Sequence, residues 1–194
     1  CEIVYEMFKE AGIQPSKEAA QALFLGIAFD TMHFMIADSN TFKTAAELIE
    51  SGVDARENLR LLATQMESPE RISRLKAAER LKLMNIGGWL IALSHVSSYQ
   101  SSAARALLGL GAHVALVCGE RGGELRVSIR SSTEFYRKTG IHLGRDIAKP
   151  LGEYMKGVGG GHSTAAGVNG GGSINQVFER CITLLREELK RCGS

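Results

Sequence analysis

Apolar residues recur at helical spacing through the first third of the chain. One predicted helix ends at Gly12, and the apolar residues on its face are Ile3, Val4, Met7, Phe8 and Ala11. A second begins at Ser16, whose hydroxyl can cap it, and runs out over residues 26–31. Its apolar face consists of Ala19, Ala20, Leu23, Phe24 and Ile27. The pattern therefore predicts a helical region at the start of the chain.

Three more helix starts follow. Thr41 is predicted to cap a third helix that Gly52 closes, and Asp54 with Glu57 makes a capping-box pattern for a fourth. Ser68-Pro69 then opens a long helix, since proline is harmless at the first helical position. We expect this helix to run over residues 68–86, largely solvated, as a connector between two parts of the chain.

The pattern changes after Gly87-Gly88, where short apolar runs alternate with helical stretches. Strands are predicted at 89–93, 113–118, 125–129 and 165–168, and helices at 101–110, 146–155 and from Ser173 onward, where Gln176 completes a capping box. Gly122-Gly123 is a hairpin signal between two of the strands. Residues 87–194 are therefore expected to form an α/β domain, a mixed sheet with helices packed on it.

Composition and net charge limit the expected binding partners and location of the chain. The chain has 194 residues and a formal net charge of +2, too weak for bulk attraction to nucleic acid or membranes, so any anion binding must be local. No apolar stretch is long enough to span a membrane, and the four cysteines show neither metal-ligand spacing nor a disulfide framework, so a cytoplasmic location is expected. The chain opens with Cys1 inside a helical pattern; we expect a piece of a longer protein, although removal of an initiator methionine is the alternative.

The segment Gly159-Gly160-Gly161-His162 is the strongest chemical signal. Glycines permit unusual backbone conformations and let a ligand approach the amides, and converging amides bind anions. His162 directly after them can exchange a proton near neutral pH. The segment is interpreted as a phosphate-binding loop; the alternative is a plain connector.

Two weaker candidates accompany it. Arg126 and Arg130 share one side of the strand at 125–129, and a guanidinium grips phosphate through two hydrogen bonds; the alternative is an exposed edge strand with solvated charges. Asp30 follows an apolar helix and is either a turn residue or a metal ligand. Its spacing from His33 does not match a zinc site.

Together these residues resemble motifs of the DHH phosphoesterase superfamily. Residues 159–167 are similar to its GGGGH-x-x-AAG signature, which lies in the DHH-associated C-terminal domain of RecJ-like nucleases and nucleotide phosphatases. The strand 128–132 resembles the arginine strand upstream of that signature, and residues 26–31 resemble the last motif of the catalytic domain. Val158 and His33 depart from the pattern: the first replaces a glycine, and the second stands where many members have arginine after Asp-Thr-Gly. No Asp-His-His triplet is present.

The resemblance implies a layout. Residues 1–67 would be the C-terminal remnant of a DHH catalytic domain, 68–86 a connector helix, and 87–194 a DHH-associated substrate-binding domain. The parent would be an Mn²⁺- or Mg²⁺-dependent phosphoesterase or exonuclease, with Asp30 as one metal ligand. The isolated chain, which lacks most metal ligands, is expected to be inactive, and whether it binds a metal ion stays open.

The resemblance also implies site roles and partners. His162 is the expected catalytic residue; the expected phosphate-binding residues are Arg126, Arg130, Ser131, Gly159, Gly160, Gly161 and His162. The expected partner is single-stranded nucleic acid, a short oligonucleotide or a nucleotide, with no membrane, and a homodimer stays open. Aromatic candidates for base stacking are Tyr99, Phe135, Tyr136 and Tyr154. The alternative function is a non-catalytic nucleic-acid-binding module resembling the C-terminal domain of alanyl-tRNA synthetase.

Overall fold

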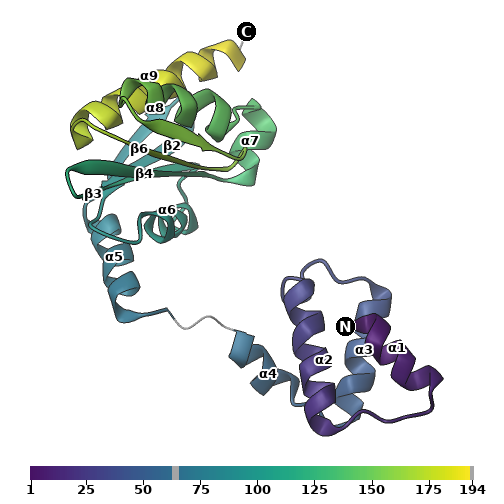
Figure 1. Ribbon diagram of the computed structural model, residues 1–194. Coiled ribbons are helices and arrows are strands. Elements are labelled where there is room, and N and C mark those ends of the chain that lie inside the picture. Colours follow the sequence, from purple (N-terminus) through teal and green to yellow (C-terminus); the bar gives the residue numbers. More distant parts are fainter. Residues whose placement is uncertain (63–65, 193–194) are drawn as a thin grey trace. The chain divides into compact units, whose positions relative to one another are not determined.

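The chain divides into two units, Cys1–Gln65 and Met66–Ser194 (Figure 1). The structure is a computed structural model, and it describes residues 1–62 and 66–192. Each unit encloses its own apolar core. Within the described residues, no helix combines the length and the apolar character needed to cross a membrane.

The first unit is helical, as the apolar spacing predicts. It contains α1 (Glu2–Glu10), α2 (Lys17–Asp30), α3 (Ser39–Glu50) and α4 (Ala55–Leu62). The Ser16 hydroxyl accepts a hydrogen bond from the Ala19 amide at 3.3 Å, which confirms the predicted cap of α2. The start of α3 was predicted wrongly: Asp38, not Thr41, caps it, because the Asp38 carboxylate accepts the Asn40 and Thr41 amides at 2.9 Å each.

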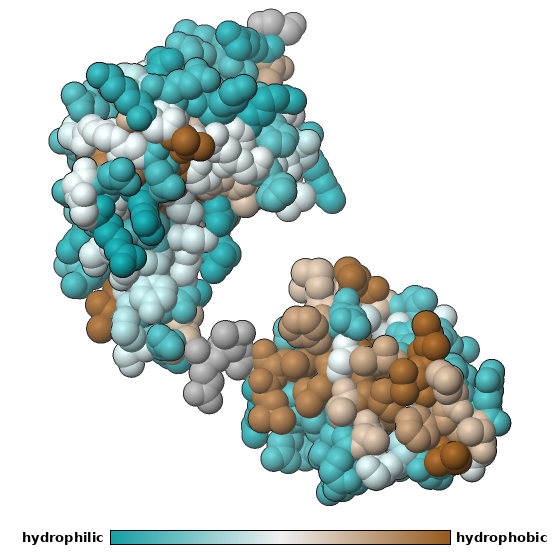
Figure 2. All heavy atoms as spheres, viewed as in Figure 1, coloured by the Kyte–Doolittle hydropathy of each residue, from teal (hydrophilic) through white to brown (hydrophobic). Residues whose placement is uncertain are grey.

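The predicted apolar face of α1 is not its buried face. Ile3 is 78% exposed and Met7 is 63% exposed, whereas Tyr5 is buried. The core of this unit gathers residues from all four helices, among them Tyr5, Leu23, Phe24, Ile27, Leu48 and Leu59. Figure 2 shows many apolar residues on the surface of the unit.

The second unit is built on a six-stranded mixed sheet, which confirms the predicted fold class. Its strands are β1 (Lys82–Ile86), β2 (Trp89–His95), β3 (Val114–Arg121), β4 (Glu124–Ser131), β5 (Val158–Gly161) and β6 (Ala165–Gly170). The order is β1-β2-β3-β4-β6-β5, with only β2 and β3 parallel among the neighbouring pairs. Gly122 and Gly123 both have positive φ in the turn from β3 to β4, as the hairpin signal predicts.

Helices cover the two faces unequally. One face carries α7 (Thr133–Thr139), a π-helical segment (Leu143–Ala148), α8 (Lys149–Tyr154) and α9 (Ile174–Cys192), over a core that includes Ile91, Leu116, Ile129, Phe135, Leu151 and Leu185. The other face packs α5 (Ser68–Glu79) and α6 (Gln100–Gly109) over small residues, including Ala77, Ala92, Ala103, Ala104 and Ala115. In Figure 1, α6 lies on the side of the sheet opposite α8 and α9.

The predicted connector helix over 68–86 is wrong in its second half. Helix α5 ends at Glu79, and residues 82–86 form β1, which pairs with β2 in a hairpin. Small residues hold α5 in the second unit: the Ala77 carbonyl accepts the Ser94 hydroxyl at 2.8 Å, and the Ser73 hydroxyl donates to the Ser98 carbonyl at 2.6 Å. A packing face of serine and alanine shows little hydrophobic periodicity. The sequence pattern therefore predicted a largely solvated helix instead of one packed on the sheet.

Candidate functional site

The glycine segment is a strand rather than a loop. Val158–Gly161 forms β5, an edge strand that pairs antiparallel with β6 and places Gly160 opposite Gly167. Its amides therefore take part in a β-ladder and do not converge on a loop ligand. The predicted anion-binding loop is replaced by a strand that carries no side chains over three residues.

Two of the three glycines are required by packing. A Cβ on Gly159 would collide with the Ala148 carbonyl oxygen, and one on Gly161 would collide with the Ala165 carbonyl oxygen. Gly161 also has φ +143°, a conformation that residues with a side chain rarely adopt. Gly159 therefore lets the helical segment around Ala148 and Gly152 lie close against β5, whereas Gly161 lets β5 lie close against the start of β6.

Packing does not require glycine at position 160 or at its partner position 167. A Cβ on Gly160 would meet no atom within 4 Å, and a Cβ on Gly167 would make an ordinary contact of 3.7 Å. Both residues are exposed and neither has positive φ. The chain therefore leaves bare backbone at a place where its own packing would accept side chains.

Gly160 and Gly167 form a strip of exposed backbone, which we call the glycine strip. Ser128 on β4 extends the same row. The strand register joins Gly160, Gly167 and Ser128 in one row across the sheet, so all three face the side that carries α6. Ser128 is 7% exposed, and its hydroxyl has no hydrogen-bond partner within the described residues. A buried hydroxyl without a partner is uncommon, and it lies in the row of exposed glycines.

Arg126 and Arg130 flank Ser128 on the same face of β4. The alternative of an edge strand is wrong, because β4 lies between β3 and β6. The Arg130 guanidinium donates to the Ser101 hydroxyl at 2.6 Å and to the Ala166 carbonyl at 3.2 Å. Burial, and secondarily Arg105, lowers the pKa of Arg130, yet arginine stays charged in proteins. Arg126 is exposed.

His162 follows β5 directly and is exposed. Its amide donates to the Ala165 carbonyl at 2.7 Å, and its carbonyl accepts the Gly144 amide at 3.1 Å. The ladder puts His162 opposite Ala165, which pairs with Arg130. The backbones of His162 and Arg130 are therefore two strands apart, roughly 10 Å.

The segment that holds the His162 backbone has its own anchor. The Asp146 carboxylate accepts the His142 amide at 2.8 Å and the Arg145 side chain at 2.6 Å and 3.0 Å. These hydrogen bonds, Arg145 foremost, hold the pKa of Asp146 below its usual range. The predicted helix start at Asp146 is three residues late, because the π-helical segment begins at Leu143 with His142 as its cap.

Not every predicted site residue lies on the sheet face that carries α6, Gly160 and Gly167, which we call the open face. Ser131 is buried and pairs in register with Val114, a residue of the core beneath α9, so Ser131 lies on the opposite face. Gly159 likewise packs toward the helices, and Gly161 packs against the backbone of β6. Among the aromatic candidates, Phe135 is fully buried and belongs to the core, whereas Tyr99 and Tyr154 are exposed.

Asp30 lies in the first unit, as the last residue of α2, and is exposed. A left-handed turn follows it, with φ of +52° at Met32, +59° at His33 and +67° at Phe34. The described residues contain no group of three or more His, Cys, Asp or Glu side chains that could hold a metal ion. Asp30 alone does not fit a pair of divalent ions.

The sequence missed three residues of the open face: Gly167, Ser128 and Ser101. Gly167 lies within the motif but has no predicted site role, and Ser128 lies in the predicted arginine strand without a role of its own. Ser101 lies on α6, and only the tertiary structure brings its hydroxyl to Arg130.

The chain is similar to several known proteins. It is 33% identical to an uncharacterized protein of Methanocaldococcus jannaschii over 98% of the chain and 60% of that protein. It is 28% identical to the bifunctional oligoribonuclease and PAP phosphatase NrnA of Thermus thermophilus, over 99% of the chain and 57% of NrnA. The chain thus spans about 60% of the length of these curated relatives.

A solved structure shares the fold. An exopolyphosphatase-related protein of Bacteroides fragilis matches with a TM-score of 0.60 at 16% identity, over 92% of the chain and 53% of that protein. No protein-family model matches the chain. The similarity to NrnA confirms the predicted resemblance to DHH-superfamily phosphoesterases, and the shared fold agrees with a DHH-associated domain.

Proposed function

We propose that the second unit binds the phosphate and sugar of a nucleotide or a short single-stranded oligonucleotide on its open sheet face. In this proposal the unit is the substrate-binding portion of a phosphoesterase, and the first unit corresponds to the end of a DHH catalytic domain. The observation that carries the proposal is the bare strip of Gly160 and Gly167, flanked in register by Arg126 and Arg130.

The charge of this face supports a phosphate ligand. The ion pairs among the described residues include neither Arg126 nor Arg130, and the hydrogen-bond acceptors of Arg130 are neutral oxygens. Guanidinium groups without carboxylate partners attract anions and grip phosphate oxygens in pairs. The bare backbone beside them lets a flat or bulky group come within contact distance of the sheet.

We assign His162 the role of the titratable group at the edge of this face. Its side chain makes no hydrogen bond within the described residues, while its backbone is held at both the amide and the carbonyl. A fixed backbone and an uncommitted imidazole suit a group that must donate a hydrogen bond or a proton to a bound phosphate ester.

Hydrolysis is proposed on the strength of the relatives. NrnA is named as an oligoribonuclease and PAP phosphatase, so an oligonucleotide or nucleotide ester is the substrate class that we favour over inorganic polyphosphate. The reaction in this superfamily would use Mn²⁺ or Mg²⁺, and Asp30 would supply one ligand. Because one carboxylate does not hold two ions, these 194 residues by themselves are expected to turn over little substrate.

The test is binding of a fluorescent, 5′-phosphorylated short oligoribonucleotide to the whole chain, measured by anisotropy. Gly160→Val should weaken binding about tenfold or more by covering the strip, a loss of about 1.4 kcal/mol. It should leave thermal stability unchanged or slightly raised, because valine favours strands. Gly109→Val is the matched control, since Gly109 ends α6 with open space around it.

The control should bind the oligonucleotide as the unmodified chain does. Equal affinity in Gly160→Val and the unmodified chain would remove the strip from the site. Arg130→Ala and His162→Ala should also weaken binding without unfolding, and unchanged affinity in both would remove these side chains from the site. Binding of a tRNA acceptor stem in preference to the oligonucleotide would favour the synthetase-like alternative.

A further inference from the structure

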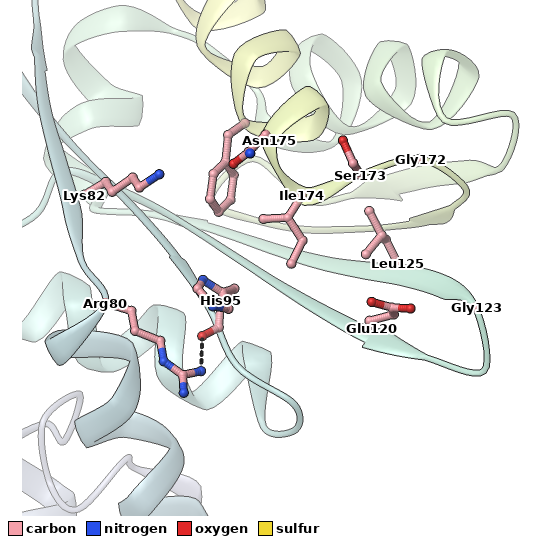
Figure 3. A pocket seen from close by; sticks show the side chains of 11 residues that line it. Arg80, Lys82, His95, Glu120, Gly123, Leu125, Gly172, Ser173, Ile174 and Asn175 are labelled. Atoms are coloured by element: carbon pink, nitrogen blue, oxygen red, sulfur yellow. Dashed lines mark hydrogen bonds between the residues drawn. The ribbon is translucent and has the colours of Figure 1, made fainter.

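A second basic region lies on the other face of the same sheet. A pocket of about 440 Å³ opens between the start of α9 and the ends of β1 to β4. Lys82, His95 and Glu120 line it from the strands, and Asn175 and Phe178 line it from α9. In Figure 3 the Lys82 side chain extends toward Asn175, and His95 lies between Lys82 and the Glu120 side of the pocket.

The strand register separates this pocket from the glycine strip. Lys82 pairs with Leu93 and His95 pairs with Cys118, and both partners belong to the core beneath α9. Gly160, Gly167 and Ser128 belong to a row that faces α6 instead. The two basic regions therefore lie on opposite sides of the sheet, and no residue is shared between them.

The pocket holds uncompensated positive charge. Its lining contains the cations Arg80 and Lys82 and a single carboxylate, that of Glu120. Within the described residues, Lys82 and Glu120 form no ion pair, and Arg80 donates only to the His95 carbonyl at 3.3 Å. In Figure 3 the Arg80 guanidinium is turned toward the His95 carbonyl and the Lys82 ammonium extends toward Asn175, so the pocket offers two separate cations that can attract an anion.

A second pocket, of about 490 Å³, continues the first along α9. The two share Lys82, Asn175 and Phe178. The second adds the apolar side chains of Met84 and Ile182 and the polar side chains of Glu179, Thr183 and Arg186. The combined groove therefore offers cations, apolar surface and hydrogen-bonding groups along its length. Such a groove fits a ligand with a compact anionic group joined to a flat body that can form hydrogen bonds, and each volume lies within the usual range for small-molecule sites.

We propose that this groove binds a nucleoside monophosphate, with the phosphate held by Arg80 and Lys82 and the nucleoside placed along α9 toward Met84. The site is separate from the proposed function and does not depend on it. Its ligand has the chemistry of a product of oligonucleotide hydrolysis.

The test is calorimetric titration of the whole chain with AMP, adenosine and inorganic phosphate. Lys82→Ala should weaken AMP binding about tenfold, the effect expected when a charged partner of phosphate is removed. Lys76→Ala is the matched control, because Lys76 is an exposed lysine of α5 that does not line the groove. The titrations are repeated in a Gly160→Val background, which covers the strip on the other face, so that the AMP binding that remains is that of the groove.

Both parts of the ligand are tested separately. AMP should bind more tightly than adenosine and more tightly than inorganic phosphate, and only AMP should perturb the amide resonances of both Asn175 and Ile182. The proposal is overturned if AMP does not bind, if Lys82→Ala matches the Lys76→Ala control, or if adenosine or phosphate alone binds as tightly as AMP. Loss of AMP binding in Gly160→Val with retention in Lys82→Ala would move the site to the glycine strip.

Discussion

The Arg130 guanidinium donates a hydrogen bond of 2.6 Å to the hydroxyl of Ser101, which ties the central strand β4 to the first turn of α6. A second nitrogen of Arg130 donates to the Ala166 carbonyl across the strand pair. The guanidinium is therefore held in one orientation before any ligand arrives, which reduces the entropy lost on binding.

Ser101→Ala should weaken oligonucleotide binding about threefold to tenfold, because it releases one of the groups that orient Arg130. The free energy of unfolding should change by less than about 1 kcal/mol, since the residue is partly exposed at the start of a helix. Anisotropy and thermal melts measure the two effects. A lysine ammonium cannot replace the planar, two-pronged guanidinium, so Arg130→Lys should lose more affinity than Ser101→Ala. The reverse order would contradict a positioning role for Ser101.

Gly159→Ala should destabilise the second unit by about 1–3 kcal/mol, because the new Cβ would collide with the Ala148 carbonyl. Gly160→Ala, one residue along the same strand, should have little effect on stability, because no atom lies within 4 Å of its Cβ position. Denaturant unfolding of the two variants makes the comparison. Equal stability loss in both would show that the glycines of β5 do not have the separate roles inferred here.

Asp146→Asn should lower stability at neutral pH by about 1 kcal/mol, the scale of a charge-assisted hydrogen bond. Because the pKa of Asp146 is lowered in the folded state, its carboxylate stabilises the fold above the usual aspartate pKa. That contribution is lost as the pH falls through the lowered value. Urea unfolding between about pH 7 and pH 2 should therefore show the gap between the variant and the unmodified chain closing in acid; a gap independent of pH would contradict the assignment.

Met32→Gly should stabilise the first unit by about 0.5–1 kcal/mol. Met32 has φ +52°, which glycine adopts without the steric cost that a side chain imposes, although glycine also adds entropy to the unfolded chain. The superfamily motif carries glycine after Asp-Thr, at the position of Met32. Met35→Gly is the matched control, because Met35 is also an exposed methionine of the same turn and is not among the residues with positive φ. A thermal melt in which both variants lose stability alike would contradict strain at Met32.

Asp30 offers a direct test of the proposal that this chain binds substrate but lacks most of the metal ligands that catalysis needs. With Mn²⁺ present, the 194-residue chain should hydrolyse a short oligonucleotide and a chromogenic phosphodiester at background rates, because the described residues hold no cluster of metal ligands. Product release measured by chromatography and absorbance checks this. Metal-dependent turnover that Asp30→Ala abolishes would show that the chain is sufficient for catalysis.

Interactions between residues close in sequence explain why several helix caps and the alternation along β4 were predicted correctly. The caps at Ser16, Asp54 and Ser173 are short-range hydrogen bonds between neighbours in sequence, and each is present in the structure. The alternation along β4 correctly placed Arg126, Ser128 and Arg130 on one side, because side chains of a strand alternate by covalent geometry.

The motif at residues 159–167 led correctly to the DHH superfamily, but not to its own conformation. Whether three glycines form a loop or a strand depends on whether another strand lies beside them, and β6 does. The same limit explains the connector: the strand at 82–86 is fixed by its pairing with β2, and the packing of α5 by serine and alanine contacts that carry little periodicity.

Sequence alone therefore indicated the resemblance to the DHH superfamily, several of the helix caps and the residues proposed to hold phosphate. Only the tertiary structure decided which of those residues share a face. It buried Ser131 on the core side, turned Gly159 toward the helices and Gly161 toward β6, and left Gly160 bare beside Gly167. The physical reason is that a residue's capacity for chemistry is covalent, whereas its access to a ligand depends on strand order and helix packing between segments distant in the chain.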